Sequence, residues 1–193
     1  MSIEIILIGP GCAGKGIFLK RADYNTWAGS RELRIADNPK SWNPLLTGRT
    51  IEQEKEFYQK NVDGETLLLY GIYIMQNDRK DKLIGLMYAF NRMLAGEKGP
   101  QQFEILKPGG SCEIGIHIFD KQSRGKGYAA EACKLFMEHL KNKYSLEKTV
   151  ACIYSSNLGS INLFKKLGYN QTGSQDNKGY VYLIYEYPFP TNK

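Results

Sequence analysis

The chain of 193 residues is long enough to bury a hydrophobic core, and 42% of its residues are hydrophobic while 24% are charged, as in ordinary globular domains. This composition excludes an intrinsically disordered chain, a collagen and a coiled coil. The 26 Lys and Arg residues outnumber the 20 Asp and Glu residues, and the formal net charge of +6 favours an anionic partner such as a phosphorylated cofactor, a nucleic acid or an acidic surface.

The first half of the chain predicts two short strands, a helical region and a β-hairpin. Residues 3–8 form an apolar run typical of a buried strand, and residues 17–21 predict a second short extended segment. Residues 24–61 are polar, with apolar side chains at helical spacing. The runs 66–75 and 83–91 are rich in leucine, isoleucine and tyrosine and flank a turn-like segment, which indicates a hairpin.

The second half of the chain alternates strands with helices. In the strand predicted at residues 112–119, Glu113, Gly115 and His117 alternate with three isoleucines, so the two sets face opposite sides of a sheet. Residues 129–140 carry apolar side chains at the spacing of an amphipathic helix. The remaining predicted elements are a strand at 149–154, a helix at 159–167 and a strand at 180–187. This order favours an α/β fold in which helices cover a mixed sheet.

The cysteines and the hydropathy pattern bear on cellular location. Cys12, Cys112, Cys133 and Cys152 include no pair at the two-residue separation of a zinc or redox motif. The sequence has no run of about 20 apolar residues that would span a membrane, and its start lacks the basic leader of a signal peptide. We therefore expect a soluble cytoplasmic protein with free thiols and no metal bound through cysteine.

Residues 9–16, Gly-Pro-Gly-Cys-Ala-Gly-Lys-Gly, form the first of two glycine-rich loops that could hold a phosphate group. Their spacing matches the P-loop of nucleotide kinases, in which backbone amides and a lysine bind phosphates. However, Gly16 stands where a serine or threonine should bind magnesium, and no downstream strand ends in a suitable aspartate. A simple glycine-rich connection is therefore preferred, and nucleotide binding stays an alternative.

Residues 122–127, Gln-Ser-Arg-Gly-Lys-Gly, form the second loop, which lies between the alternating strand and the amphipathic helix. Gly125 and Gly127 let the backbone approach a bulky anion closely, and free amides at the start of the helix point toward such an anion. Positive charge surrounds the same point, from Lys121, Arg124 and Lys126. This loop is the better candidate for a phosphate site.

Several motifs follow one another between residues 112 and 169. The strand and the second loop are followed by the helix and then by Asn157, Ser160, Leu163, Leu167, Gly168 and Tyr169. In this order the sequence resembles the GCN5-related N-acetyltransferase (GNAT) superfamily, and within it the branch of ribosomal-protein alanine acetyltransferases. Weaker agreement extends over about residues 16–190, whereas the glycine-rich residues 1–15 are not explained. We expect one N-acetyltransferase domain over residues 1–193.

The resemblance implies a mixed, mostly antiparallel central sheet that splays between its fourth and fifth strands, with helices on both faces. Acetyl-CoA would bind at the splay as a co-substrate, without a metal. Its pyrophosphate would bind the amides of the second loop, and its pantetheine arm would pair with the strand backbone. The residues assigned to acetyl-CoA are His117, Ile118, Phe119, Gln122, Arg124, Gly125, Lys126, Gly127, Tyr128, Ala129 and Asn157.

An acceptor amine is protonated at neutral pH, so a base must take up its proton. Glu113 is the first candidate because it lies beside the expected acyl site, and His117 is the second because a histidine pKa is ordinarily near neutrality. Both also have a purely structural interpretation, as a solvated strand end and a packed histidine. Many superfamily members carry a tyrosine at the position of Phe164, and its hydroxyl protonates the departing thiolate. Tyr154, Ser155 or water would have to replace it.

The sequence therefore predicts an acetyl-CoA-dependent N-acetyltransferase that acts by direct transfer in a ternary complex rather than through an acyl-cysteine. The acceptor would be a protein N-terminus or a small-molecule amine, and the net charge no longer argues for nucleic acid. A homodimer is compatible with this prediction, and no membrane partner is expected. Two alternatives stay open: a P-loop-type nucleotide-binding protein using Gly9 to Gly16, and a non-catalytic acyl-CoA sensor, which the absence of the tyrosine favours.

Overall fold

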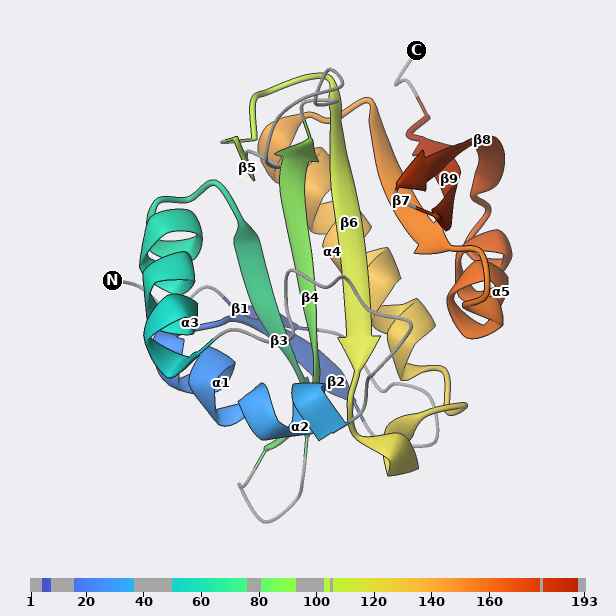
Figure 1. The fold of residues 1–193 in the computed structure, drawn as a ribbon. Coiled ribbons are helices and arrows are strands. Elements are labelled where there is room, and N and C mark those ends of the chain that lie inside the picture. The colour runs from blue at the N-terminus through green and yellow to red at the C-terminus, as the bar shows by residue number, and fades with distance from the viewer. Residues whose placement is uncertain are drawn as a thin grey trace.

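The computed structural model describes residues 5–7, 16–36, 50–75, 81–92, 103–104, 106–177 and 179–190 (Figure 1). Within these residues the chain forms one nine-stranded sheet with the strand order β1-β2-β3-β4-β6-β7-β9-β8, and β5 pairs with β4 outside this path. The strands are β1 (Ile5–Leu7), β2 (Ile17–Arg21), β3 (Leu68–Ile74), β4 (Lys82–Arg92), β5 (Phe103–Glu104), β6 (Ser111–Ile118), β7 (Lys148–Tyr154), β8 (Asn170–Asn177) and β9 (Tyr180–Pro188).

Helices cover both faces of this sheet (Figure 1). On one face, α4 packs its apolar side against the central strands, and on the other face lie the short helices of the first half of the chain. The helical elements are α1 (Tyr24–Gly29), α2 (Arg31–Ala36), α3 (Ile51–Tyr58), the π-helical turn η3 (Gln59–Asp63), the 3₁₀ turn η4 (Lys121–Ser123), α4 (Tyr128–Tyr144) and α5 (Leu158–Lys166).

The sheet opens in its middle. All strand pairs of the described residues are antiparallel except β6 with β7, which run parallel. Their pairing covers only residues 111–113 of β6 and 148–150 of β7, and beyond it the two strands separate (Figure 1). We call this separation the β6–β7 divergence. Without the short β1 and β5, these strands are the fourth and fifth of the sheet, so the expected fold, including its splay, is confirmed.

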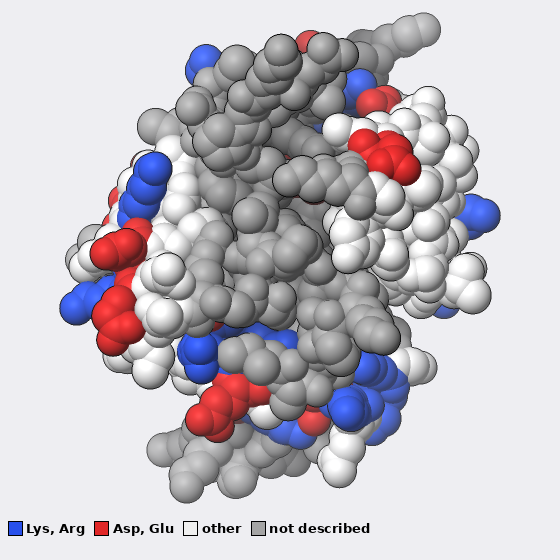
Figure 2. Space-filling model, viewed as in Figure 1, with Lys and Arg blue, Asp and Glu red and all other residues white. Residues whose placement is uncertain are grey.

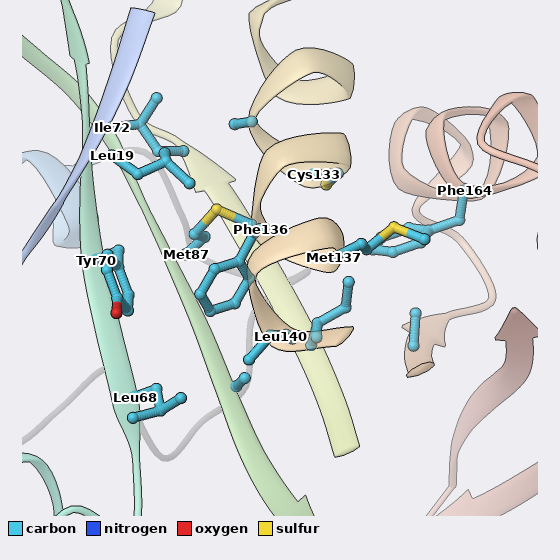
Figure 3. Close-up of a cluster of buried hydrophobic side chains, with 14 of the residues drawn as sticks. Leu19, Leu68, Tyr70, Ile72, Met87, Cys133, Phe136, Met137, Leu140 and Phe164 are labelled. Atoms are coloured by element: carbon cyan, nitrogen blue, oxygen red, sulfur yellow. The ribbon is translucent and has the colours of Figure 1, made fainter. Parts of the chain in front are cut away.

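The main core lies between α4 and the sheet. Figure 3 shows Phe136 of α4 on the side of β3 and β4, and Met137 beside Phe164 of α5. The ring of Phe136 meets that of Tyr70 edge to face at 5.2 Å. Both rings are fully buried. Because burial of one such side chain stabilises the fold by roughly 1.5–3 kcal/mol, this layer fixes α4 on the sheet. This packing therefore fixes the position of the N-terminus of α4 beside β6.

A buried charge pair ties the helices of the opposite layer together. The Arg34 guanidinium lies 3.6 Å from the centre of the Trp27 ring and 3.3 Å from the carboxylate of Glu54. Its Nε donates to Ser30 Oγ at 3.0 Å. Arg34 and Glu54 are only 2% and 3% exposed, and Arg31 Nε lies 3.7 Å from the same carboxylate. Removing Glu54 would therefore take the carboxylate from a buried guanidinium, which is strongly destabilising. The pair thus fixes α1 and α2 against α3.

Within the described residues the predicted elements agree with the structure to within a few residues, with two strands missed, β8 and the two-residue β5. β8, with the sequence Asn-Gln-Thr-Gly-Ser-Gln-Asp-Asn, is polar and mostly exposed. It is an edge strand paired only with β9 among the described strands, so neither of its faces shows the apolar alternation by which strands are recognised. The polar sequence of such an edge strand also disfavours pairing with strands of other chains.

Candidate active site

The β6–β7 divergence leaves part of the β6 backbone without a strand partner. The amide of Phe119 donates to the carbonyl oxygen of Ile84 at 3.1 Å. In an antiparallel pair the backbone groups of successive residues point to alternate sides. The odd-numbered residues of β6 therefore bond to β4, and Ile116 and Ile118 direct their amide and carbonyl groups toward the divergence. Three residues were expected to pair with the pantetheine arm: His117, Ile118 and Phe119. Of these, Ile118 directs backbone groups toward the divergence. Ile116 does so too, although the sequence did not predict it.

The two candidate bases stand at opposite ends of this stretch. Glu113 pairs with Val150 at the last position of the parallel ladder, so it marks the point at which the strands begin to separate. His117 is buried, with its ring edge to face with Phe119 at 5.8 Å. Four residues of strand separate the two by about 13 Å. A single bound amine can therefore reach one of them but not both, and the geometry places Glu113 at the opening.

A third titratable side chain, which sequence reasoning missed, lies beside Glu113. Tyr88 of β4 pairs with Gly115 of β6, on the same face as Glu113 and two residues along. Burial raises the pKa of the Tyr88 hydroxyl, and the neighbouring Glu113, Cys152 and Tyr182 raise it further. The hydroxyl therefore stays protonated at neutral pH, as a hydrogen-bond donor or acceptor beside the divergence.

The predicted alternatives for the proton donor lie at the far end of β7. Tyr154 is half-buried and its ring packs against Tyr180 and Tyr182 of β9, with centroids 5.8 and 5.7 Å away. Ser155 is exposed, and its backbone amide donates to Val181 at 2.9 Å. Tyr154 is the last residue of β7 and Ser155 follows it, and these contacts join both residues to β9, on the side of β7 away from β6.

The second glycine-rich loop has the geometry of an anion site. Gly125 and Gly127 have φ angles of +72° and +86°, in the left-handed region that glycine adopts without strain. A Cβ at Gly125 would meet no atom within 4 Å, so the backbone there is open to a bound group. Gly127 is the N-cap of α4 and supplies no side-chain cap, which leaves the first amides of the helix, from Tyr128 and Ala129 on, to a ligand.

Positive side chains surround this loop, and one of them is used within the protein. Figure 2 shows Lys and Arg side chains gathered near the end of β6 and over η4. Lys121, Gln122 and Lys126 are exposed. Arg124 instead turns back, and its Nε and Nη2 both donate to the carbonyl oxygen of Ile118, at 2.8 and 2.7 Å. Arg124 therefore holds the loop against the end of β6 as well as adding charge.

Asp120 fixes the other side of the loop. Its carboxylate accepts hydrogen bonds from Lys82 Nζ at 2.7 Å and from Ser123 Oγ at 2.5 Å. Burial alone would raise the pKa of Asp120, but these two hydrogen bonds and the charge of Lys82 outweigh burial and hold it below its ordinary value. The start of β4 and the turn before the loop are thus joined through one ionised carboxylate, which the sequence pattern did not reveal.

Asn157 and Phe164 belong to α5. The side-chain oxygen of Asn157 accepts from the amide of Ser160 at 3.1 Å and caps the helix, which leaves its side-chain nitrogen as the group that could donate to a cofactor amide. Phe164 is 2% exposed. Its ring meets that of Tyr169 at 4.9 Å, and it points toward Met137 in the core (Figure 3). This position therefore serves packing in the structure.

The described cysteines are free thiols. Burial raises the pKa of both Cys112 and Cys133 to about 12, so neither is a thiolate at neutral pH and neither is activated as a nucleophile. Cys152, in β7, is half-buried. Cys12, with most of the P-loop-like segment, lies outside the described residues.

Two absences concern the described part of the chain only. No group of three or more His, Cys, Asp or Glu side chains that could hold a metal ion occurs among these residues. No helix in them is both long enough and apolar enough to cross a membrane.

Comparison with known proteins gives a consistent picture. The family model for the acetyltransferase (GNAT) domain matches residues 19–170. A relative, the probable N-acetyltransferase YjcK of Bacillus subtilis (strain 168), is 24% identical over 116 residues. The alignment covers 60% of this chain and 55% of that protein, so the chain spans about half the length of this relative.

Solved structures share the fold. RimL, a ribosomal L7/L12 alpha-N-protein acetyltransferase, superposes with a TM-score of 0.66 at 15% identity, over 98% of this chain and 96% of that chain. The aminoglycoside acetyltransferase AAC(6′)-Ib, in complex with ribostamycin and coenzyme A, gives 0.71 at 19% identity, over 89% and 93%. The spermidine N-acetyltransferase of Vibrio cholerae, with CoA and spermine, gives 0.68 at 15% identity, over 89% and 95%.

Proposed function

The chain belongs to the GNAT acetyltransferase domain family, and from this premise we propose that it transfers the acetyl group of acetyl-CoA to a primary amine, directly within a ternary complex. This proposal rests on one observation, that the strand backbone at the β6–β7 divergence leads directly into the glycine-rich loop. The backbone groups of Ile116 and the amide of Ile118 have no strand partner among the described residues beyond the parallel ladder. They lead along β6 to the open loop at Gly125 and Gly127, where the uncapped N-terminus of α4 begins.

The chain's own residues fit acetyl-CoA along this line. The amides from Gly125 to Ala129 would bind the pyrophosphate, with Gln122 and Lys126 at its side, because a helix N-terminus favours negative charge. The amide of Arg124, also expected to bind there, instead donates to Lys121. The backbone of Ile116 and Ile118 would pair with the pantetheine amides as a neighbouring strand does. The side-chain nitrogen of Asn157 would donate to the same arm from α5.

When bound, acetyl-CoA supplies an acyl group activated as a thioester. Glu113 would accept the proton that the amine must lose, directly or through one water. A backbone amide of β6 would donate to the carbonyl oxygen as negative charge develops on it, and such a fixed donor stabilises the transition state more than the ground state. His117 is the second candidate for the base, since it faces the same side of the sheet from the other end of the stretch.

Proton donation to the departing thiolate needs another group, because phenylalanine at 164 has none to give. Tyr154 and Ser155, at the end of β7, are the proposed donors, together with water. The raised pKa values of Cys112 and Cys133 support direct transfer over an acyl-cysteine, since both thiols stay protonated and buried at neutral pH.

The acceptor is proposed as a protein N-terminus or a small-molecule amine. The names of similar folds include acetyltransferases of a ribosomal protein, of aminoglycosides and of spermidine, and all of these acceptors present an amine. The free thiols of the described cysteines favour a reducing compartment, and we place the protein in the cytoplasm. We also propose that the chain folds as one N-acetyltransferase domain and acts as a monomer or a homodimer.

Binding and turnover separate this proposal from its rivals. Acetyl-CoA should raise the melting temperature and release free thiol with at least one member of a panel of amino-terminal peptides, polyamines and amino sugars. A shift with ATP and magnesium but not with acetyl-CoA would support nucleotide binding instead. Acetyl-CoA binding without thiol release from any amine would support the non-catalytic sensor.

A further inference from the structure

The ring of Tyr88 lies directly on Gly115. A Cβ built on Gly115 would be 2.2 Å from Cζ and 2.3 Å from Oη of Tyr88, far closer than any real contact. The tip of the phenol therefore occupies the space that a side chain at position 115 would fill. Only glycine permits this arrangement, so the two residues form one unit across the β4 and β6 pair.

This unit lies at the opening of the sheet. Gly115 is the first residue beyond the last parallel pair, Glu113 with Val150, that presents its side-chain position to the same face as Glu113. Two strand residues correspond to about 7 Å. The ring of Tyr88 is partly buried and continues toward Phe90 on its own strand, with centroids 6.1 Å apart. It thus forms an apolar wall immediately beside the proposed base.

A wall at this place bears on the acyl group. On the proposed function, the amine lies within hydrogen-bonding reach of Glu113, and the acyl carbon lies within about 3–3.5 Å of the amine. The atoms attached to that carbon then have the phenol ring of Tyr88 as a neighbour. A two-carbon acyl group needs little room there, whereas each further methylene would have to displace the ring or turn away from it.

The geometry points to Tyr88 as the residue that limits the length of the acyl group, by filling the space over Gly115 into which a longer acyl chain would extend. This inference rests on the proposed use of an acyl-CoA at the β6–β7 divergence. One methylene in a closed pocket changes discrimination by about 10- to 200-fold, so the volume of one aromatic ring is sufficient to separate acetyl-CoA from butyryl-CoA.

The test measures binding of acetyl-CoA and butyryl-CoA by calorimetry, because binding does not require the acceptor to be known. The wild-type protein should bind acetyl-CoA at least about 10-fold more tightly than butyryl-CoA, and Tyr88→Ala should reduce that ratio by about 10-fold or more. Tyr88→Phe keeps the ring and should keep the ratio. Tyr73→Ala, which removes a ring stacked on Phe18 at 5.1 Å elsewhere in the sheet, should also keep it.

Each outcome decides the matter. An unchanged ratio in Tyr88→Ala, or an equal change in Tyr88→Phe, would overturn the assignment of the ring, as would equal binding of the two acyl-CoAs by the wild type. Should Tyr88→Ala fail to fold, as judged by thermal unfolding, Tyr88→Leu carries the same test with less loss of volume. Binding of neither acyl-CoA to the wild type would instead refute the proposed function, and this inference with it.

Discussion

The guanidinium group of Arg124 donates two hydrogen bonds to a single backbone oxygen, that of Ile118. The residue that brings positive charge to the phosphate loop thus also ties that loop to the end of β6. The loop and the strand are the two parts of the proposed acetyl-CoA site, so their relative position depends on the planar shape of this side chain. A lysine has the same charge but cannot make the paired contact.

We therefore expect Arg124→Lys to weaken acetyl-CoA binding by about 5- to 10-fold, as measured by calorimetry, which corresponds to the loss of one ordinary hydrogen bond. Arg124→Gln removes the charge as well and should bind more weakly still. If Arg124→Lys binds like the wild type while Arg124→Gln does not, charge alone matters and the role given to the paired contact is wrong.

Glu113→Gln should lower turnover much more than affinity. Loss of a general base reduces the rate by about 100- to 10,000-fold, whereas the amide is close in size and leaves the β6 backbone in place. The rate is measured by thiol release with an amine that the panel identifies, and affinity by calorimetry. Glu138→Gln, on the exposed side of α4, is the control. An unchanged rate in Glu113→Gln would remove Glu113 as the base and bring His117 forward.

Gly125→Val should weaken acetyl-CoA binding because of backbone conformation rather than crowding. The space around position 125 is open, but the φ of +72° costs an ordinary residue about 1–2 kcal/mol, and the loop would relax away from its present shape. Gly179, in the β8–β9 turn, has a φ of +83° and equally open surroundings. Gly179→Val should therefore cost similar stability without affecting affinity, and equal loss of binding in both variants would contradict the loop assignment.

Phe164→Tyr should destabilise the protein. The ring is buried against Tyr169, and an added hydroxyl without a hydrogen-bond partner costs about 1–3 kcal/mol. Urea unfolding measures the change, with the half-buried Phe189→Tyr as a control that should stay within about 0.5 kcal/mol of the wild type. A Phe164→Tyr protein of full stability and faster turnover would show instead that this position reaches the departing thiolate.

Acid should weaken the Asp120 contact. Since the pKa of Asp120 is lower in the folded state than its unfolded value of about 4, the carboxylate stabilises the fold above that value, and this stabilisation is lost as the pH falls through the folded pKa. We expect Asp120→Asn to cost about 1 kcal/mol at pH 7, because Lys82 is 42% exposed. The cost should be smaller at pH 3.

Urea unfolding of both proteins at the two pH values measures this difference. Lys82→Met should remove part of the same pH dependence, because it removes the charge that faces Asp120. An Asp120→Asn protein whose loss of stability is as large at pH 3 as at pH 7 would show that the ionised form is not what the fold uses.

Side-chain patterns allowed several local features of the candidate site to be predicted, because each rests on local chemistry. Alternation along residues 112–119 placed Glu113 and His117 on one face, and the three isoleucines indeed pack toward the main core. Glycines at 125 and 127 indicated a left-handed loop, and both have positive φ. In each case the information lies within a few neighbouring residues.

Other features depend on which strands become neighbours. Whether Ile116 or His117 directs its amide to the divergence follows from the register with β4, which no pattern within β6 encodes. Tyr88 was missed for the same reason, since its contact with Gly115 exists only through that register. The N-cap formed by Asn157 could have been predicted from the sequence, because asparagine is a preferred residue at the start of a helix.

The separation of β6 from β7 amounts to an edge placed inside a sheet. Sheet edges are open to pairing with any extended chain, and proteins usually protect them by charge, proline or cover. Here the backbone groups of Ile116 and the amide of Ile118 lie between two strands of the same molecule, so a thin, flexible ligand can enter where a second folded chain would be excluded by the flanking strands. Slow hydrogen exchange at these two amides should therefore appear only when such a ligand completes the sheet.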